Sequence, residues 1–312
     1  MSLPDWLESR LQLPVIAAPM FIVSQLELVL AQCRSGIVGS FPSLNARPDG
    51  VFEQWLVRLN AELTDNDAPF AVNLIVHRSN ARLERDIEIC HRHKVPIWIT
   101  SLGARPEVNA AAHDCGGIAL HDVINDRFAR KAIDKGADGL IAVAAGAGGH
   151  AGLQSPFALV QEIRDWFDGP LLLSGAIATG RAVLSAQAMG ADLAYIGSPF
   201  IATDEANAPP EYKRMIVESN AMDIVTSSLF TGVSGNYLAP SIRAAGLDPD
   251  NLGSADARAM NFGDNAAKAK AWSQIWGSGQ GIGAVRDVLP AGQRIEMLAR
   301  DHAEAKRMLC AA

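Results

Sequence analysis

A histidine surrounded by glycines is the strongest chemical feature of this sequence. His150 lies in the stretch Ala145-Gly-Ala-Gly-Gly-His-Ala-Gly152, which holds four glycines. Small residues let a backbone lie flat against a planar ligand, and an imidazole changes charge near neutral pH. Packing alone does not require so many glycines around one histidine. We interpret this loop as an active-site segment with His150 as its catalytic residue; a plain flexible loop is the alternative.

Two further loops combine small residues in a way that is typical of anion-binding sites. Ser174-Gly175-Ala176 and Gly197-Ser198 each follow a short apolar run. Small residues allow backbone N–H groups to approach an anion, and a helix that starts there adds the positive end of its dipole. In a barrel, the loops after the last two strands are the usual phosphate site. We therefore predict that the two loops bind phosphate together, the alternative being that their glycines merely turn the chain.

Polar or rigid residues at the ends of other apolar runs are additional candidates. Asn73 interrupts the apolar stretch Ala71–Ile75. A buried amide is costly unless its donors and acceptors are satisfied. A heterocycle with alternating donors and acceptors would satisfy it, and so would backbone groups, which is the structural alternative. His121 ends another apolar run and is a second-tier candidate. Ala17-Ala-Pro-Met20 would keep rigid backbone groups near a ligand, although this signal is weak alone.

The elements that must position these residues are eight short apolar runs separated by helical patterns. The runs are nearly all apolar, without alternation, as expected for strands buried on both faces. Repetition of such units predicts a closed (β/α)8 barrel, a TIM barrel, with a doubly wound open sheet as the alternative. The predicted strands are Val15–Ala18, Ile37–Ser40, Phe70–Leu74, Ile97–Thr100, Ile118–His121, Gly139–Val143, Leu171–Ser174 and Leu193–Ile196.

Several helix ends are also readable. Ser24-x-x-Glu27 predicts a capping box, and Gly36 a helix stop. Ser155-Pro156 reads as an N-cap followed by proline at the first helical position. Thr179 is expected to cap the helix that ends at Gly190.

The amino-acid composition of the chain changes after the eighth apolar run. We predict a (β/α)8 barrel with the cofactor site over residues 1–203, an inserted lid or substrate segment over 204–285 and a C-terminal helix within 286–312 that packs on the barrel. The inserted segment is richer in Pro, Asn, Ser and Asp and is broken by glycines. It is expected to be either a mobile lid over the barrel mouth or a packed appendage. Helical patterns are predicted at Glu211–Asn220, Ala266–Ile275 and Arg294–Leu309.

Composition limits the classes of partner. The 312 residues are 49% apolar and 20% charged, with a net charge of -7 and no basic cluster. Nucleic acid and membrane are therefore not expected as partners, because both need concentrated Lys and Arg. The charged start, Met1–Arg10, is not expected to be a signal peptide. Four cysteines lack Cys-x-x-Cys spacing, and the histidines are scattered, so we expect free thiols, a cytoplasmic location and no metal site.

Five stretches carry a resemblance to a known family. Taken together they resemble the nitronate monooxygenase family, formerly called 2-nitropropane dioxygenases. They occur in family order over roughly residues 10 to 205, and the combination is specific although each motif alone is not. The stretches are Pro14-Val-Ile-Ala-Ala-Pro-Met20, Val72-Asn-Leu74, Gly148-Gly-His-Ala-Gly152, Ser174-Gly-Ala-Ile-Ala-Thr-Gly180, and Gly190-Ala-Asp192 through Gly197-Ser-Pro-Phe-Ile-Ala-Thr203.

The resemblance implies a non-covalent FMN in the barrel mouth. Its phosphate would lie on the loops after the last two strands, and its ring near the loop after the first strand and near Asn73. His150 corresponds to the family's catalytic histidine. The cofactor-binding candidates are Ala18, Pro19, Met20, Asn73, His121, Gly148, Gly149, Ser174, Gly175, Ala176, Gly197 and Ser198.

The sequence departs from the family pattern at two places, and both concern the substrate more than the flavin site. Many relatives have a Glu four residues before the histidine, where this chain has Gly146. The stretch Ser228–Tyr237 is less basic than its counterpart in relatives that oxidise nitronates. The flavin site is therefore better supported than the nitronate substrate. The same scaffold also hosts NAD(P)H-dependent quinone reductases and FMN-dependent enoyl reductases.

Three functions follow as hypotheses. The first is FMN-dependent oxidation of alkyl nitronates or nitroalkanes with O2, a small-molecule monooxygenase reaction. The second is a reductase that passes electrons from NADH or NADPH to a quinone or an enoyl thioester; without a Gly-x-Gly-x-x-Gly fingerprint, the nicotinamide would stack on the flavin. The third is a non-enzymatic binder of flavin or a phosphate ligand. The C-terminal third is expected either to cover the mouth or to form a homodimer contact.

Overall fold

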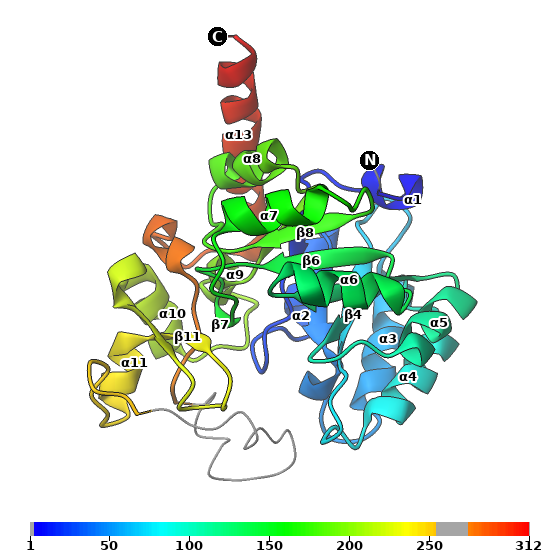
Figure 1. The fold of residues 1–312 in the computed structure, drawn as a ribbon, viewed down its shortest axis with the longest axis horizontal. Coiled ribbons are helices and arrows are strands. Elements are labelled where there is room, and N and C mark those ends of the chain that lie inside the picture. The colour runs from blue at the N-terminus through cyan, green and yellow to red at the C-terminus, as the bar shows by residue number, and fades with distance from the viewer. Residues whose placement is uncertain (1–2, 254–273, 312) are drawn as a thin grey trace.

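The computed structural model describes residues 3–253 and 274–311 and contains a closed barrel of parallel strands (Figure 1). The eight strands follow the order β1-β9-β8-β6-β5-β4-β3-β2. A bridge between Ile16 and Val38 joins the two ends of this order, so the sheet is a barrel and the open-sheet alternative is excluded. The strands are β1 Val15–Ala17, β2 Gly39–Pro42, β3 Phe70–Ile75, β4 Ile97–Ser101, β5 Ile118–Val123, β6 Gly139–Val143, β8 Leu171–Ser174 and β9 Leu193–Ile196.

Alternate residues of each strand face opposite sides of the barrel wall. Ile16, Ile99 and Leu120 belong to a cluster inside the barrel. Their strand neighbours, such as Trp98 and Ala119, pack outward under the surrounding helices. Both faces are apolar, which explains why the predicted runs showed no alternation. The predicted strands are confirmed, except that β2 begins two residues later than expected.

The helices that surround the barrel bear out some of the predicted ends. Thr179 accepts a hydrogen bond from the N–H of Ala182, and Gly190 ends that helix with a left-handed conformation (φ 111°). The predicted capping box at Ser24 is wrong: Gln25 occupies the N-cap position, and the Ser24 hydroxyl instead accepts from the N–H of Met20. The helices are α1 Asp5–Glu8, α2 Leu26–Arg34, α3 Val51–Glu62, α4 Leu83–Arg92, α5 Pro106–Asp114, α6 Asp126–Asp134, α7 Pro156–Arg164, α8 Gly180–Met189 and α9 Ser198–Ile201, with a 3-10 turn η1 at Ser43–Asn45.

The chain after α9 forms a separate group of elements beside the barrel (Figure 1). Strands β10 and β11 join β7, the short strand that contains His150, in a three-stranded antiparallel sheet. The predicted helix Ala266–Ile275 lies largely outside the described residues. The elements are β7 Gly149–His150, α10 Pro210–Glu218, η2 Ala221–Asp223, β10 Ile224–Ser227, β11 Gly235–Leu238, α11 Ala239–Ala244, η4 Gln280–Ala284 and α13 Ala291–Cys310.

Helix α13 returns to the barrel and packs on α8 and α2 (Figure 1). The approach to α8 is close, because a Cβ on Gly180 would overlap the backbone of Leu298 and His302. Glycine at that position therefore permits the helix contact. The predicted C-terminal helix is confirmed and extends a few residues beyond its expected bounds.

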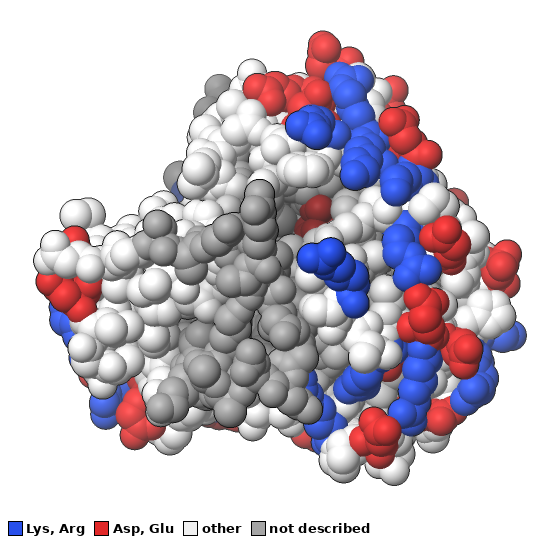
Figure 2. All heavy atoms as spheres, turned by 60° about the horizontal axis from the view of Figure 1, so that its bottom comes forward, with Lys and Arg blue, Asp and Glu red and all other residues white. Residues whose placement is uncertain are grey.

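The surface carries charges of both signs. Figure 2 shows Lys and Arg side chains interspersed with Asp and Glu over one half of the face drawn, as expected from many helix-surface ion pairs such as Arg58–Glu62 and Arg105–Glu84. None of the helices in the described ranges is both long and apolar enough to cross a membrane.

Candidate active site

Backbone groups at the ends of β8 and β9 form a small cavity with the character of an anion site. The N–H of Gly175 and that of Ser198, the first residue of α9, donate to no acceptor within the described chain. The first N–H groups of a helix lack partners inside that helix, so they point toward a ligand. Gly175 (φ 153°) and Ala176 (φ 54°) both have positive φ angles, and the N–H of Ala176 donates to the carbonyl of Gly146 (3.2 Å). We call this arrangement the cradle. Its lining also includes Gly146–Gly148, Ser174, Ile177, Tyr195 and Gly197.

A second segment, from beyond the barrel, completes the cradle. The N–H of Gly279 donates to Ser198 Oγ (2.9 Å), and that of Gln280 donates to the carbonyl of Gly146 (2.9 Å). A Cβ on Gly148 would lie 2.7 Å from the Gly279 nitrogen, so the two backbones touch directly. Sequence reasoning treated the glycines of this segment as chain breaks and missed this role. Their spacing of two residues, from Gly277 to Gly283, was the available signal.

The loop after β1 adjoins the cradle. A Cβ on Gly197 would lie 3.4 Å from Ala18 Cβ and 3.5 Å from Met20 Sδ. Asn45 holds this loop: its Nδ2 donates to the carbonyls of Met20 (3.0 Å) and Ser24 (2.7 Å). Ala18, Pro19 and Met20 are therefore brought next to Gly197 and Ser198. Asn45 was not among the predicted residues, because its partners are distant in the chain.

His150 is fixed by the sheet that links its loop to the segment after the barrel. In the register of this sheet, His150 pairs with Gly235 and Gly149 pairs with Asn236. His150 Nε2 lies 2.9 Å from Thr231 Oγ1. Burial lowers the pKa of His150 to about 4, so the imidazole is neutral at physiological pH. The histidine loop also lines the cradle through Gly146–Gly148.

A hydrogen-bonded group of side chains faces inward at the ends of β3, β4 and β5. Asn73 Nδ2 donates to Ser101 Oγ (2.7 Å) and to the carbonyl of Ile99 (3.2 Å). Ser101 in turn bonds the carboxyl group of Asp122, whose pKa burial raises to about 6. The donors of Asn73 are thus satisfied by the protein, as the structural alternative expected. Its carbonyl oxygen has no partner within the described residues, which leaves that atom to accept from a ligand.

His121 and Asp122 face opposite sides of the barrel wall. His121 Nδ1 lies 2.6 Å from Thr100 Oγ1 on the outer face, and burial, with a smaller contribution from Lys131, lowers its pKa to about 4. The structure therefore does not bring His121 together with the other predicted site residues. Its neighbour Asp122 points inward near Tyr195, whose pKa is raised by burial and by this carboxyl group. Sequence reasoning chose the wrong one of the two adjacent residues for the mouth, although strand alternation counted from Asn73 and Ser101 was available as a signal.

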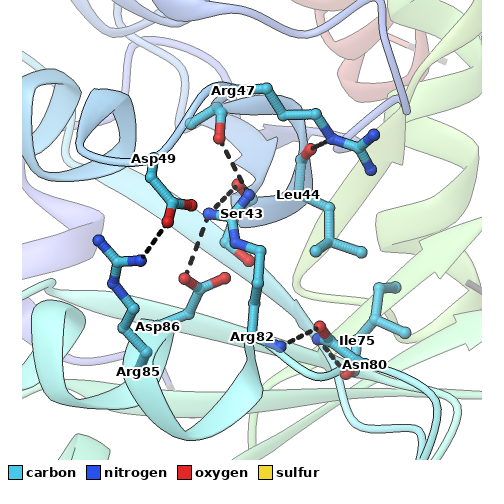
Figure 3. Close-up of polar contacts among 10 residues, drawn as sticks. Ser43, Leu44, Arg47, Asp49, Ile75, Asn80, Arg82, Arg85 and Asp86 are labelled. Carbon is cyan, nitrogen blue, oxygen red and sulfur yellow. Dashed lines mark hydrogen bonds and ion pairs between the residues drawn. The ribbon is translucent and has the colours of Figure 1, made fainter. Parts of the chain in front are cut away.

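An arginine network stiffens the rim formed by the loops after β2 and β3 (Figure 3). Arg82 donates to the carbonyls of Ala46 (3.0 Å) and Ser43 (3.3 Å) and pairs with Asp86 at 3.2 Å. Asp86 is fully buried, and burial raises the pKa of its carboxyl group. A second ion pair, Arg85–Asp49, links helix α4 to the loop after β2 at the surface. This network is structural and supports the loop that carries Asn45.

Comparison with known proteins identifies the family. The family model described as nitronate monooxygenase matches residues 78–301, more than two thirds of the chain. The chain belongs to the nitronate monooxygenase family. Members of this family are flavin-dependent oxidoreductases, which confirms the family and the class of enzyme that the sequence motifs indicated.

Individual relatives agree with this assignment. A nitronate monooxygenase of Paraburkholderia phytofirmans is 26% identical, with 92% of each chain covered. A nitronate monooxygenase of Neurospora crassa is 28% identical over 65% of this chain and 58% of its own length. A protein of Mycobacterium tuberculosis named as a monooxygenase is 30% identical, and the match spans 41% of that protein. For these last two relatives the match therefore covers only about half of the relative's length.

Solved structures show the same architecture. The nitroalkane oxidase of Streptomyces ansochromogenes superposes with a TM-score of 0.81 at 25% identity, covering 98% of this chain and 100% of that one. FabK of Thermotoga maritima also gives a TM-score of 0.81, at 24% identity, covering 98% of this chain and 97% of that one. The second likeness concerns the fold alone.

The residues present fit a flavin cofactor. The cradle exposes N–H donors at a helix start, as a phosphate requires. Side chains larger than glycine would fill this space: a Cβ on Gly175 would lie 2.9 Å from the carbonyl of Ala145, and one on Gly146 would lie 3.2 Å from Ala176 Cβ. Among the residues that the structure describes, no cluster of three or more His, Cys, Asp or Glu could hold a metal ion.

Proposed function

We propose that the protein is an FMN-dependent nitronate monooxygenase that oxidises alkyl nitronates, or the parent nitroalkanes, with O2. One observation carries the proposal: in a chain of this family, the histidine loop and the cradle line a single cavity. Two residues after the part of the loop that lines the cavity comes His150, which we propose to act beside a phosphate-anchored cofactor. When bound, FMN would supply the electron transfer between substrate and O2.

The proposed binding roles follow from where the groups lie. The phosphate site would be lined by Ser174, Gly175, Ala176, Gly197 and Ser198, with the backbone N–H groups of Gly175 and Ser198 as donors. Ala18–Met20, Gly148, Gly149 and the carbonyl oxygen of Asn73 would contact the ring. We propose FMN as the flavin because the cradle offers one compact anion site at the start of one helix. His121 is excluded from this set, since it faces the helices.

His150 is proposed to bind the anionic nitronate and to accept a proton when the neutral nitroalkane is the substrate. Its depressed pKa keeps the ring neutral at pH 7, so that it can donate one hydrogen bond and accept a proton at the other nitrogen. Deprotonation of a nitroalkane at carbon gives the nitronate itself. A neutral histidine therefore serves both forms of the substrate.

We further propose that the described part of residues 204–285 acts as a cover of the barrel 1–203, with the helix in 286–312 packed on the barrel. The support is the bonding between this segment and the histidine loop: Asn236 Nδ2 donates to the carbonyl of Ala147 (2.6 Å), and β11 pairs with β7. Such a cover would keep water from the reacting atoms. The cysteines are free thiols, which supports a cytoplasmic location.

The test is an absorbance spectrum of the purified protein, followed by anaerobic titration with propyl-2-nitronate and, separately, with NADH. We expect a flavin spectrum that nitronate bleaches and O2 restores, with O2 consumed in step with nitronate. Rapid bleaching by NADH with no response to nitronate would replace this proposal with a nicotinamide-dependent reductase. A colourless protein that also binds no added FMN in a calorimeter would reject both.

A further inference from the structure

A chain of hydrogen bonds links three side chains at the ends of β3, β4 and β5. Asn73 Nδ2 donates to Ser101 Oγ (2.7 Å), and Ser101 bonds the carboxyl group of Asp122. We call these three residues the relay. We infer that Ser101 and Asp122 are positioning residues, which hold the Asn73 amide so that its carbonyl oxygen, and not its NH2 group, faces the cofactor. The site then selects a ring edge that offers an N–H donor, which in an oxidised flavin is the imide. The inference rests on the proposed flavin site for the identity of the ring.

The direction of each bond in the relay follows from groups that can only accept. Asn73 Nδ2 also contacts the backbone carbonyl of Ile99 (3.2 Å), which has no hydrogen to give, so the amide nitrogen must lie on that side. Both hydrogens of the NH2 group are then used, one on Ile99 and one on Ser101. At pH 7.5 the Asp122 carboxyl group, with a pKa of about 6, is ionised and can only accept. Ser101 Oγ therefore accepts from Asn73 and gives its single proton to Asp122.

Asp122 is itself held in place by the backbone at the end of β4. The N–H of Leu102 bonds its carboxyl group, and Leu102 has a φ of 64°, in the left-handed region that residues other than glycine seldom adopt. Such a conformation persists only where the surrounding structure fixes it. The end of β4 thus supplies two donors to one carboxylate, the hydroxyl of Ser101 and the N–H of Leu102. The carboxylate is therefore a fixed acceptor for the serine proton.

The open end of the relay is the carbonyl oxygen of Asn73. Asn73 is only 4% exposed, yet this oxygen has no partner within the described residues and is not enclosed by them. The relay adjoins the cavity of the cradle, because Tyr195 lines that cavity and its pKa is raised by burial and by the Asp122 carboxyl group. An unsatisfied acceptor in a largely buried position favours a ligand atom that donates. The imide is the one N–H group of an oxidised flavin ring, so it is the donor that fits.

The experiment reads the ring N–H directly. FMN labelled with 15N is bound to the purified protein at pH 7.5, and the imide N–H is observed in a 1H–15N spectrum. In the wild type we expect a slowly exchanging imide proton. Asp122→Asn can donate to Ser101 and so free the serine proton to turn toward Asn73, and Ser101→Ala breaks the relay outright. Both variants should move the imide proton upfield and speed its exchange. Thr100→Val is the matched control, because it removes the neighbouring hydroxyl of β4 on the outer face of the barrel.

FMN affinity provides the second measurement. Calorimetric titration should give a Kd about 5-fold weaker for Asp122→Asn and for Ser101→Ala, the scale of one hydrogen bond, and an unchanged Kd for Thr100→Val. With FMN methylated at the imide nitrogen, the difference between wild type and variants should vanish, since the ring then has no N–H to donate. A relay that served only to stabilise the fold would weaken both flavins equally. Circular dichroism checks that each variant folds, and either relay variant suffices if the other does not.

The outcomes separate this inference from the proposed function. An imide proton that exchanges as fast in the wild type as in the relay variants would overturn the inference, even if nitronate is consumed. An equal loss of affinity for FMN and for the methylated flavin would overturn it as well. If the imide proton behaves as expected but no nitronate is consumed, the relay stands and the proposed substrate fails. A protein that binds no FMN would overturn both.

Discussion

The cradle and the histidine pocket are connected through Gly146–Gly148 but are built in different ways. The cradle is made of backbone: N–H groups of Gly175 and Ser198 that follow directly after their strands. The histidine pocket is made of side chains, His150 and Thr231, which come from distant parts of the chain. A backbone site should tolerate loss of a side chain but not the addition of a Cβ. A side-chain site should behave in the opposite way.

The largest expected effect is in the histidine pocket. Replacing His150 by Gln should lower kcat/KM for the nitroalkane by about 10²- to 10⁴-fold, the range for loss of a general base. FMN affinity should change little, because the cradle does not use the imidazole. Oxygen consumption and calorimetric titration with FMN measure the two quantities. His121→Gln is the matched control, since His121 faces outward; equal loss in both variants would contradict the division between the two regions.

A substitution in the cradle should have the reverse profile. Gly175→Ala places a Cβ 2.9 Å from the carbonyl of Ala145 at a φ of 153°, which disfavours any residue but glycine. Strain on the order of 1–3 kcal/mol, released by displacing the loop, predicts an FMN affinity about 10- to 100-fold weaker. Gly253→Ala, with open space around its Cβ, is the control for substitution of a glycine as such. Unchanged FMN binding in Gly175→Ala would show that the cradle is not the phosphate site.

The side-chain network at the ends of β3–β5 gives a prediction about pH and stability. Burial raises the pKa of Asp122 from 3.8 to about 6, so the folded state binds a proton more tightly than the unfolded state. The contribution of this group to stability is therefore present at low pH and is lost as pH rises from about 4 to 6. Asp122→Asn should be more stable than wild type at pH 7.5, by on the order of 1–2 kcal/mol after allowance for partial exposure.

Urea unfolding of both proteins at pH 4.5 and 7.5 checks this sign. The opposite slope from His150, whose pKa is lowered, is common to the two proteins and cancels in the difference. A gap between variant and wild type that does not grow with pH would mean that folding does not raise the pKa of Asp122.

The smallest effect is expected where a side chain of the cradle only supports backbone. Ser198→Ala removes the acceptor for the N–H of Gly279 and should cost about 1 kcal/mol of unfolding free energy, the usual value for one hydrogen bond. Ser174→Ala should cost less, because no bond from its hydroxyl to the described chain is present. Urea unfolding orders the two variants. A larger loss of FMN binding from Ser174→Ala than from Gly175→Ala would reverse the comparison drawn above.

The sequence was sufficient for features whose cause is local. Buried parallel strands read as short apolar runs, so seven of the eight predicted strands begin at the residue where the structure begins them. The helix cap at Thr179 and the stop at Gly190 depend only on neighbouring residues, and both are confirmed. The glycine loops after β6, β8 and β9 were recognised for the same reason, because a site built from backbone groups requires small residues at consecutive positions of the sequence.

What only the tertiary structure decided are contacts between distant residues. Asn45, in the turn after β2, anchors the loop after β1 by donating to the carbonyl of Met20, 25 residues away. The side of the wall that His121 and Asp122 face, and the approach of Thr231 to His150, depend on register and on chain pairing. A one-residue change in register exchanges the two faces of a strand. The residues next to His150 in the sequence do not indicate that its hydrogen-bond partner is Thr231, 81 positions away.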